Sequence, residues 1–256
     1  MPDSIELNDI EAIALEAGDT IMEIYNRDFS IEYKDDKSPL TEADLASNDV
    51  IIKALEKYNL PIMSEEGREI PYEERKDWEY YWCIDPIDGT KEFIKKNGEF
   101  TVNIALIHKD TPILGVVYAP ALKDMYKAKK GEGAFKNDQS LPLTVNNSPE
   151  KSLKVVASKS HLSDETQAFI DDLAKDTESI EQVSKGSSLK LVMVAEGTAD
   201  VYPRLAPTME WDTAAADAIV REAGKMVYQY SGHVSQNPEP LKYNKKDLLN
   251  PYFMVR

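Results

Sequence analysis

The first apolar positions of the chain recur every three or four residues, the spacing that places side chains on one face of an α-helix. These positions are Ile10, Ile13, Ala14, Ala17, Ile21 and Ile24. Asn8 is followed three residues later by Glu11, a pair that resembles a capping box, so we expect the helix to begin near Asn8. The chain therefore opens with an amphipathic helix.

A second helix is expected after a polar loop over residues 33–40. It should begin at Thr41, because a residue that favours the N-cap precedes a new helical pattern and Asp44 follows three positions later. Taken alone, Asp44 is most simply explained as a partner in this cap. The candidates for the buried face are Leu45, Ile51, Ile52 and Leu55.

The middle of the chain is dominated by short apolar runs that predict strands. They cover residues 61–63, 80–84, 99–107 and 113–118, and the segments 124–128 and 134–135 extend the same meander. In the run over 99–107, Phe100, Val102, Ile104 and Leu106 alternate with other residues, as expected of a strand.

The pattern changes after residues 146–149 to strands and helices in alternation, which indicates an α/β half. The expected order is a strand over 153–157, a helix over 163–174, a strand over 180–183, a helix over 187–196, a short strand at 201–202, a helix over 211–223 and a strand over 226–228. We therefore predict an N-terminal α+β domain over 1–147 and a C-terminal α/β domain over 148–256.

The composition of the 256 residues is that of a globular protein, with 42% hydrophobic and 30% charged residues. A formal net charge of −16 argues against nucleic-acid binding through a broad basic face. No apolar run approaches the roughly 20 residues of a membrane span, and the first residues lack the pattern of a secretory signal. Cys83 is the single cysteine and allows no internal disulfide, so we expect a cytoplasmic protein.

The candidate chemistry lies in the run Asp85-Pro86-Ile87-Asp88-Gly89-Thr90. Its two carboxylates and the carbonyl of Ile87 are hard oxygen ligands of the kind that Mg²⁺ prefers, and the proline restricts the turn between them. Gly89 would let a phosphate approach the backbone closely. The motif by itself is equally consistent with a simple turn.

Two further acidic positions stand at predicted element ends, Glu65 in Ser64-Glu65-Glu66 and Asp212 in Trp211-Asp212. Together with the run over 85–90 they resemble the Mg²⁺-dependent, lithium-sensitive phosphatases of the inositol monophosphatase superfamily. Further segments are similar to the CysQ-type 3′(2′),5′-bisphosphate nucleotidases of that superfamily. They are residues 91–93, 98–105, 157–161, 186–190, 210–215 and 243–251. The resemblance implies a layered αβαβα sandwich of the sugar-phosphatase type.

The resemblance also implies a set of metal ligands. Glu65, Asp85 and the Ile87 carbonyl would hold one Mg²⁺ ion, and Asp85, Asp88 and Asp212 would hold a second. A third, weaker ion would lie near Glu65 and Asp44.

In this family pattern Thr90 and Asp44 orient and deprotonate the water that attacks phosphorus, by in-line displacement. Gly89 and Thr90 would also contact the substrate phosphate. A hydroxyl that is hydrogen-bonded to a carboxylate can accept a proton from water, so the assignment is chemically reasonable.

The residues that would bind the nucleoside belong to the second half of the chain. By resemblance His161 lies by the adenine, and Ser187, Lys190 and Arg204 lie near the sugar and its 5′-phosphate. Arginine offers a bidentate fork to phosphate and lysine a point charge. Lys159 and Lys185 could add to the local positive field.

The implied activity is hydrolysis of adenosine 3′,5′-bisphosphate (PAP) to AMP and phosphate in sulfur metabolism, with the sulfated form PAPS as a further substrate. An inositol monophosphatase or a fructose-1,6-bisphosphatase-like sugar phosphatase is the first alternative, because these enzymes share the metal site. A non-catalytic sensor of Mg²⁺ or nucleotide is the second. The resemblance leaves peripheral association with the inner membrane open.

Overall fold

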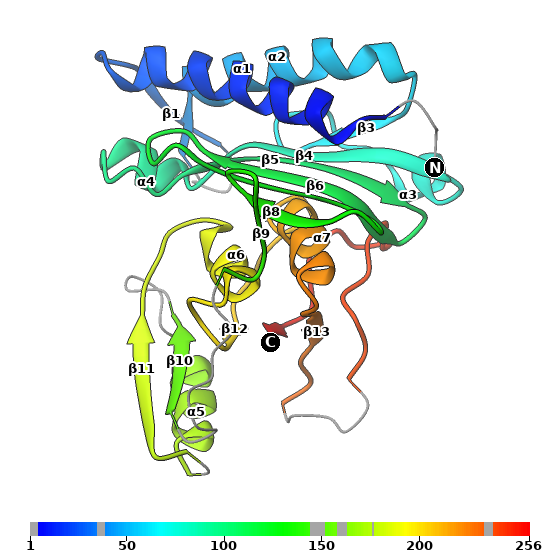
Figure 1. Ribbon diagram of the computed structural model, residues 1–256. Helices are drawn as coiled ribbons and strands as arrows, with labels where there is room; N and C mark the ends of the chain where they lie inside the picture. The colour runs from blue at the N-terminus through cyan, green and yellow to red at the C-terminus, as the bar shows by residue number, and fades with distance from the viewer. Residues whose placement is uncertain (1–4, 35–38, 144–151, 158–162, 176, 233–237) are drawn as a thin grey trace.

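The computed structural model describes residues 5–34, 39–143, 152–157, 163–175, 177–232 and 238–256. Two long helices, α1 (Leu7–Tyr25) and α2 (Glu42–Leu55), lie side by side over one face of a large sheet (Figure 1). Their apolar stripes face the sheet, where Ile10, Ile21 and Ile51 are fully buried. This burial fixes the outermost layer of the fold.

The large sheet has seven strands in the order β3-β4-β5-β6-β7-β8-β9. The strands are β3 (Ile62–Ser64), β4 (Tyr80–Asp88), β5 (Thr101–His108), β6 (Thr111–Ala119), β7 (Asp124–Lys129), β8 (Gly133–Lys136) and β9 (Gln139–Ser140). Only the first pair, β3 with β4, runs parallel; the others are antiparallel. Seven of the eight residues of β5 are buried, because helices cover both faces of the sheet.

The second face is covered by α6 (Leu189–Glu196) and α7 (Ala214–Glu222). Below them lie the parallel pair β10 (Ser152–Val156) and β11 (Ser179–Val183) and a three-stranded sheet in the order β12-β14-β13. Its strands are β12 (Tyr202–Arg204), β14 (Phe253–Val255) and β13 (Val227–Gln229). The helix α5 (Asp164–Leu173) packs beyond them (Figure 1).

Helices and sheets thus alternate in five layers, which confirms the predicted αβαβα arrangement. Short elements complete the fold. They are β1 (Ile31–Tyr33), β2 (Pro39–Thr41), a 3₁₀ turn (Glu56–Tyr58), α3 (Tyr72–Arg75) and α4 (Thr90–Ile94). None of the described helices is long and apolar enough to cross a membrane. The boundary predicted at 147/148 falls within residues 144–151, outside the described part, and the two-domain division stays a prediction.

Three local expectations need correction. Asn8 lies inside α1, and Glu6 stands at the N-cap without a side-chain cap, so the Asn8–Glu11 capping box is wrong. Leu45 is 47% exposed and does not belong to the buried face of α2. The strand β14 at the C-terminal end was not foreseen, because a three-residue strand carries too little pattern to recognise.

Gly115 of β6 is where the sheet and α7 come closest, and it supports a stability prediction. A Cβ at this position would lie 2.1 Å from the carbonyl oxygen of Ala215 and 2.8 Å from Cβ of Ala218. We expect Gly115→Ala to destabilise the fold by about 1–3 kcal/mol or more, because backbone cannot move aside as a side chain can. Thermal unfolding measures the loss.

Gly18 of α1 provides a matched comparison. Its added Cβ would also be too close to a neighbour, at 2.4 Å, but that neighbour is the ring of Tyr118. Gly18→Ala should therefore cost less, since the ring can shift and alanine favours the helix. Equal unfolding temperatures for Gly115→Ala and the unmodified protein would contradict the close packing of β6 on α7.

Candidate active site

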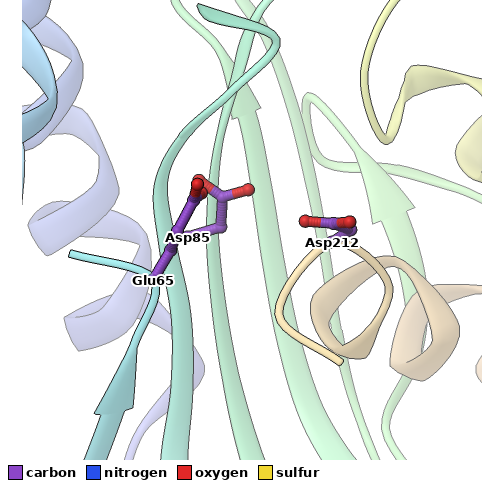
Figure 2. Close-up of side chains that lie close together, drawn as sticks. All are labelled: Glu65, Asp85 and Asp212. Atoms are coloured by element: carbon purple, nitrogen blue, oxygen red, sulfur yellow. The ribbon is translucent and has the colours of Figure 1, made fainter. Parts of the chain in front are cut away.

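Three carboxylates from distant parts of the chain converge beside the sheet. One oxygen each of Glu65, Asp85 and Asp212 lies within 4.8 Å of the others. Glu65 follows β3, Asp85 belongs to β4, and Asp212 points toward both from the turn before α7 (Figure 2). The structure thus brings together three of the four acidic residues that the sequence singled out.

The strands β3 and β4 position the first two carboxylates through their backbone. The Glu65 N–H donates to the carbonyl of Ile84 at 3.2 Å, which continues the pairing of β3 with β4. The β4–β5 register shifts between Asp85 and Asp88, so that Pro86 and Ile87 form an irregularity in the strand. A proline cannot donate to a neighbouring strand, and such bulges redirect side chains. The Asp85 carboxylate then accepts the Ile87 N–H at 3.0 Å.

The electrostatics of this cluster favour a bound cation. Asp85 is 1% exposed, and burial together with the charges of Glu65 and Asp88 raises its pKa well above the usual range. Burial and the charge of Asp88 likewise raise the pKa of Asp212. Buried like charges without a counter-ion are costly. The donor set consists of hard oxygens, so these residues fit a divalent cation such as Mg²⁺ or Mn²⁺.

Asp44 and Thr90 form a hydrogen-bonded pair next to the cluster. Thr41 caps α2, and its N–H and hydroxyl donate to Asp44 Oδ2 at 2.8 and 2.6 Å. The Thr90 hydroxyl donates to Asp44 Oδ1 at 3.1 Å and lies 3.4 Å from the Ile87 carbonyl. The cap predicted at Thr41 is therefore present, and the same carboxylate also faces the site. Burial raises the pKa of Asp44, opposed by these hydrogen bonds.

Gly89 joins β4 to α4 in a conformation that favours glycine. Its φ is +93°, and a Cβ would lie 3.2 Å from the Glu99 carbonyl and 3.3 Å from Cβ of Ser187. A short helix, α4, follows this turn and begins at Thr90. The absence of a side chain at Gly89 therefore lets the run over residues 85–90 and the loop before α6 approach each other.

A cavity of about 600 Å³ opens over the cluster. Its walls include Glu65, Asp88, Gly89, Thr90, Ser187, Lys190, Arg204 and Asp212, all of them residues predicted from the sequence. Asp88 is not part of the three-carboxylate group; burial raises its pKa to about 6, and the charge of Lys190 opposes that shift. His161 and Lys159 lie outside the described residues.

Two polar atoms at this cavity lack partners among the described residues. The buried Ser187 hydroxyl and the Arg204 Nε make no hydrogen bond there. Lys190 is 9% exposed and donates to the Ser187 carbonyl at 2.7 Å; burial lowers its pKa, and the charge of Asp88 opposes that shift. Buried polar atoms without partners are uncommon, and a ligand is one way to satisfy them.

Sequence reasoning missed three ion pairs in or beside the wall of this cavity. Lys34 donates to Glu65 at 3.0 Å and to Glu66 at 2.6 Å, so a cationic side chain already meets the acidic cluster. Glu99 accepts the Lys185 ammonium at 3.1 Å and the Gly186 N–H at 2.8 Å. Lone charged residues in loops carry no pattern from which such long-range pairs can be predicted.

Comparisons with known proteins agree with this geometry. The model of the "Inositol monophosphatase family" matches residues 2–252. A 3′(2′),5′-bisphosphate nucleotidase CysQ of Salmonella typhimurium is 43% identical over 97% of this chain and 98% of its own length. The corresponding protein of Haemophilus influenzae is 36% identical over 97% of this chain and 91% of its own length.

A solved structure shows the same fold. The crystal structure of CysQ from Bacteroides thetaiotaomicron, described as a bacterial member of the inositol monophosphatase family, has 44% sequence identity and a TM-score of 0.86. It covers 99% of this chain and 98% of its own. The matches extend across both halves of the chain. The chain therefore belongs to the inositol monophosphatase family, a family of phosphatases.

Proposed function

We propose that this protein is a Mg²⁺-dependent phosphatase that hydrolyses adenosine 3′,5′-bisphosphate to AMP and phosphate, and that PAPS is a further substrate. The observation that carries the proposal is that one cavity joins an acidic cluster to Arg204 and the buried Lys190. A substrate with two phosphate groups matches both parts of this cavity, with one phosphate at the cation-binding cluster and the other at the basic residues. The names of the relatives, which are bisphosphate nucleotidases, support the same assignment.

The ligands of the ions are proposed from the family resemblance, and the approach of Glu65, Asp85 and Asp212 to one another supports it. Glu65, Asp85 and the Ile87 carbonyl would hold one Mg²⁺ ion, and Asp85, Asp88 and Asp212 a second. A third ion near Glu65 and Asp44 would compete with Lys34, whose ammonium already lies 3.0 Å from Glu65. Bound Mg²⁺ supplies Lewis acidity at the phosphoryl oxygens and lowers the pKa of water.

Thr90 and Asp44 would move the proton of the attacking water. The Thr90 hydroxyl is fixed by its hydrogen bond to Asp44 Oδ1, which leaves its oxygen free to accept from water. Asp44 is held in turn by Thr41, so the carboxylate cannot rotate away. A positioned general base of this kind contributes about 10²–10⁴-fold to a rate.

Lys190, Arg204 and Ser187 would bind the nucleotide away from the reacting phosphate. The unpartnered Arg204 Nε and Ser187 hydroxyl provide donors for the 5′-phosphate and the sugar. Together with bound Mg²⁺, these cations would offset the negative field of a chain of net charge −16 at the place where a polyanion binds.

Phosphate release from four substrates tests the assignment. We expect fast release from adenosine 3′,5′-bisphosphate and PAPS with Mg²⁺, and slow release from inositol 1-phosphate and fructose 1,6-bisphosphate. Faster turnover of either sugar phosphate would assign the chain to the sugar phosphatases. Tight Mg²⁺ or nucleotide binding without release from any of the four would indicate a sensor instead.

Arg204 supports a prediction about substrate preference. Arg204→Ala should lower kcat/KM for adenosine 3′,5′-bisphosphate by about 10–100-fold, since a hydrogen bond to a charged group contributes about 1.5–3 kcal/mol. The loss for 3′-AMP, which has no 5′-phosphate, should be much smaller. Arg204→Lys is the matched control, because it keeps the charge but not the fork. Equal losses on both substrates would remove Arg204 from the 5′-phosphate site.

A further inference from the structure

Asp212 lies in a turn, so its position depends on what holds that turn. Its carboxylate accepts the Met209 N–H at 2.8 Å, and its own N–H donates to the Met209 carbonyl at 3.3 Å. These two bonds close the turn on itself without attaching it to the sheet. Glu210 connects the turn to its neighbours instead. Its carbonyl accepts the N–H groups of Thr213 and Ala214 at the start of α7, and its N–H donates to the Leu248 carbonyl at 3.1 Å.

The Glu210 side chain faces away from the cavity and is fully buried. It accepts three hydrogen bonds from the C-terminal segment: the Asn244 N–H at 2.7 Å, the Lys245 N–H at 3.0 Å and the Lys245 ammonium at 2.6 Å. A carboxylate that is removed from water requires such compensation. Glu210 does not line the cavity, so the reaction itself does not account for its charge.

The segment that holds Glu210 is tied to the N-terminal half by Arg75 of α3. Arg75 is 2% exposed and donates to Asn244 Oδ1 at 2.9 Å and to the Lys245 and Lys246 carbonyls at 2.7 and 3.1 Å. Asn244 returns a hydrogen bond to the Arg75 carbonyl at 2.8 Å. The turn that carries Asp212 is therefore linked to the half that carries Glu65 and Asp85.

We infer that Glu210, Lys245 and Arg75 form a positioning clamp that sets the distance between the Asp212 carboxylate and the carboxylates of Glu65 and Asp85. The clamp residues are positioning residues, since none touches the reacting atoms. The inference rests on the proposed function, because it assigns the clamp a purpose in cation binding. Partners behind metal ligands commonly change metal affinity by about 10–100-fold when they are removed.

Within the clamp, Lys245 and Glu210 form a neutral ion pair. The Lys245 ammonium also donates to Asn250 Oδ1 at 3.2 Å, and Asn250 donates to the Met209 carbonyl at 2.7 Å. Lys245 thus holds Glu210 directly and Met209 through Asn250. The Lys245 ammonium also compensates the negative charge of Glu210, which lies two residues from Asp212.

Calorimetric titration of the full-length protein with Mg²⁺, without substrate, tests the clamp. Glu210→Gln and Lys245→Met should each weaken Mg²⁺ binding by about tenfold or more, and Lys245→Arg should largely preserve it. The double variant should bind no more weakly than either single variant, because the two residues act as one unit. Lys245 is partly exposed, so Lys245→Met keeps the test available if Glu210→Gln fails to fold.

Glu196→Gln is the matched control. Glu196 is also buried and paired with a lysine, Lys136 at 2.9 Å, but it lies outside the cavity and the clamp. We expect wild-type Mg²⁺ affinity for Glu196→Gln even where unfolding in EDTA shows a similar loss of stability. Equal weakening by Glu196→Gln, or wild-type affinity in Glu210→Gln, would overturn the clamp. A wild-type protein that binds no Mg²⁺ would overturn the proposed function and the clamp with it.

Discussion

Asp85→Asn is expected to lower turnover of adenosine 3′,5′-bisphosphate by about 10³-fold or more. Asp85 is the most enclosed carboxylate of the cluster and lies between Glu65 and Asp88. Its charge supports cation binding, which contributes several kcal/mol of charge stabilisation in the transition state; about 4 kcal/mol corresponds to about 10³-fold in rate. Steady-state phosphate release at several Mg²⁺ concentrations measures the effect.

The same substitution should leave the fold intact or stabilise it in EDTA. Asparagine keeps the oxygen that accepts the Ile87 N–H and removes one of the buried like charges. Each kcal/mol of repulsion removed would raise the unfolding temperature by about 2–4 °C. Asp172→Asn on the exposed surface of α5 is the control and should change neither property. Loss of activity together with a lower unfolding temperature in EDTA would indicate misfolding instead of a lost cation ligand.

Thr90→Val is expected to lower kcat by about 10²–10⁴-fold with little change in KM. Valine has nearly the shape of threonine but cannot bridge Asp44 to a water molecule. The reacting phosphate would still bind, so the loss should appear in the chemical step. Single-turnover phosphate release separates that step from binding.

Thr90→Ser is the matched variant because it restores the hydroxyl. It should recover most of the activity, whereas Asp44→Asn should resemble Thr90→Val. The combination of Thr90→Val with Asp44→Asn should be little worse than either alone, since the two groups act as a unit. A Thr90→Val protein with kcat within about twofold of wild type would exclude this pair from proton transfer.

The part of the site that the sequence predicted best is local in the chain. The run from Asp85 to Thr90 forms one strand end, one turn and one helix start, and its residues need only local geometry to meet. The cap formed by Thr41 and Asp44 is local too. The mutual approach of Glu65, Asp85 and Asp212 was expected only through family resemblance, because spacing along the chain does not reveal contacts across the fold.

The parts that were missed depend on long-range packing. Lys34 meets Glu65 and Glu210 meets Lys245 over more than thirty residues of chain, and Arg75 meets Asn244 across the two halves. A single charged residue is as compatible with a solvated surface as with such a buried pair. The order of strands in the large sheet, by contrast, follows largely from consecutive antiparallel runs that the sequence did indicate.

The central claim is that the acidic cluster is a catalytic cation site. Its most direct test is turnover of adenosine 3′,5′-bisphosphate by exhaustively chelated protein during a titration with Mg²⁺. We expect no phosphate release in the chelated state. The rate of release should rise to full activity as Mg²⁺ is added, with AMP as the other product. Undiminished release after chelation would contradict the assignment of the acidic cluster at Glu65, Asp85 and Asp212 as a catalytic cation site.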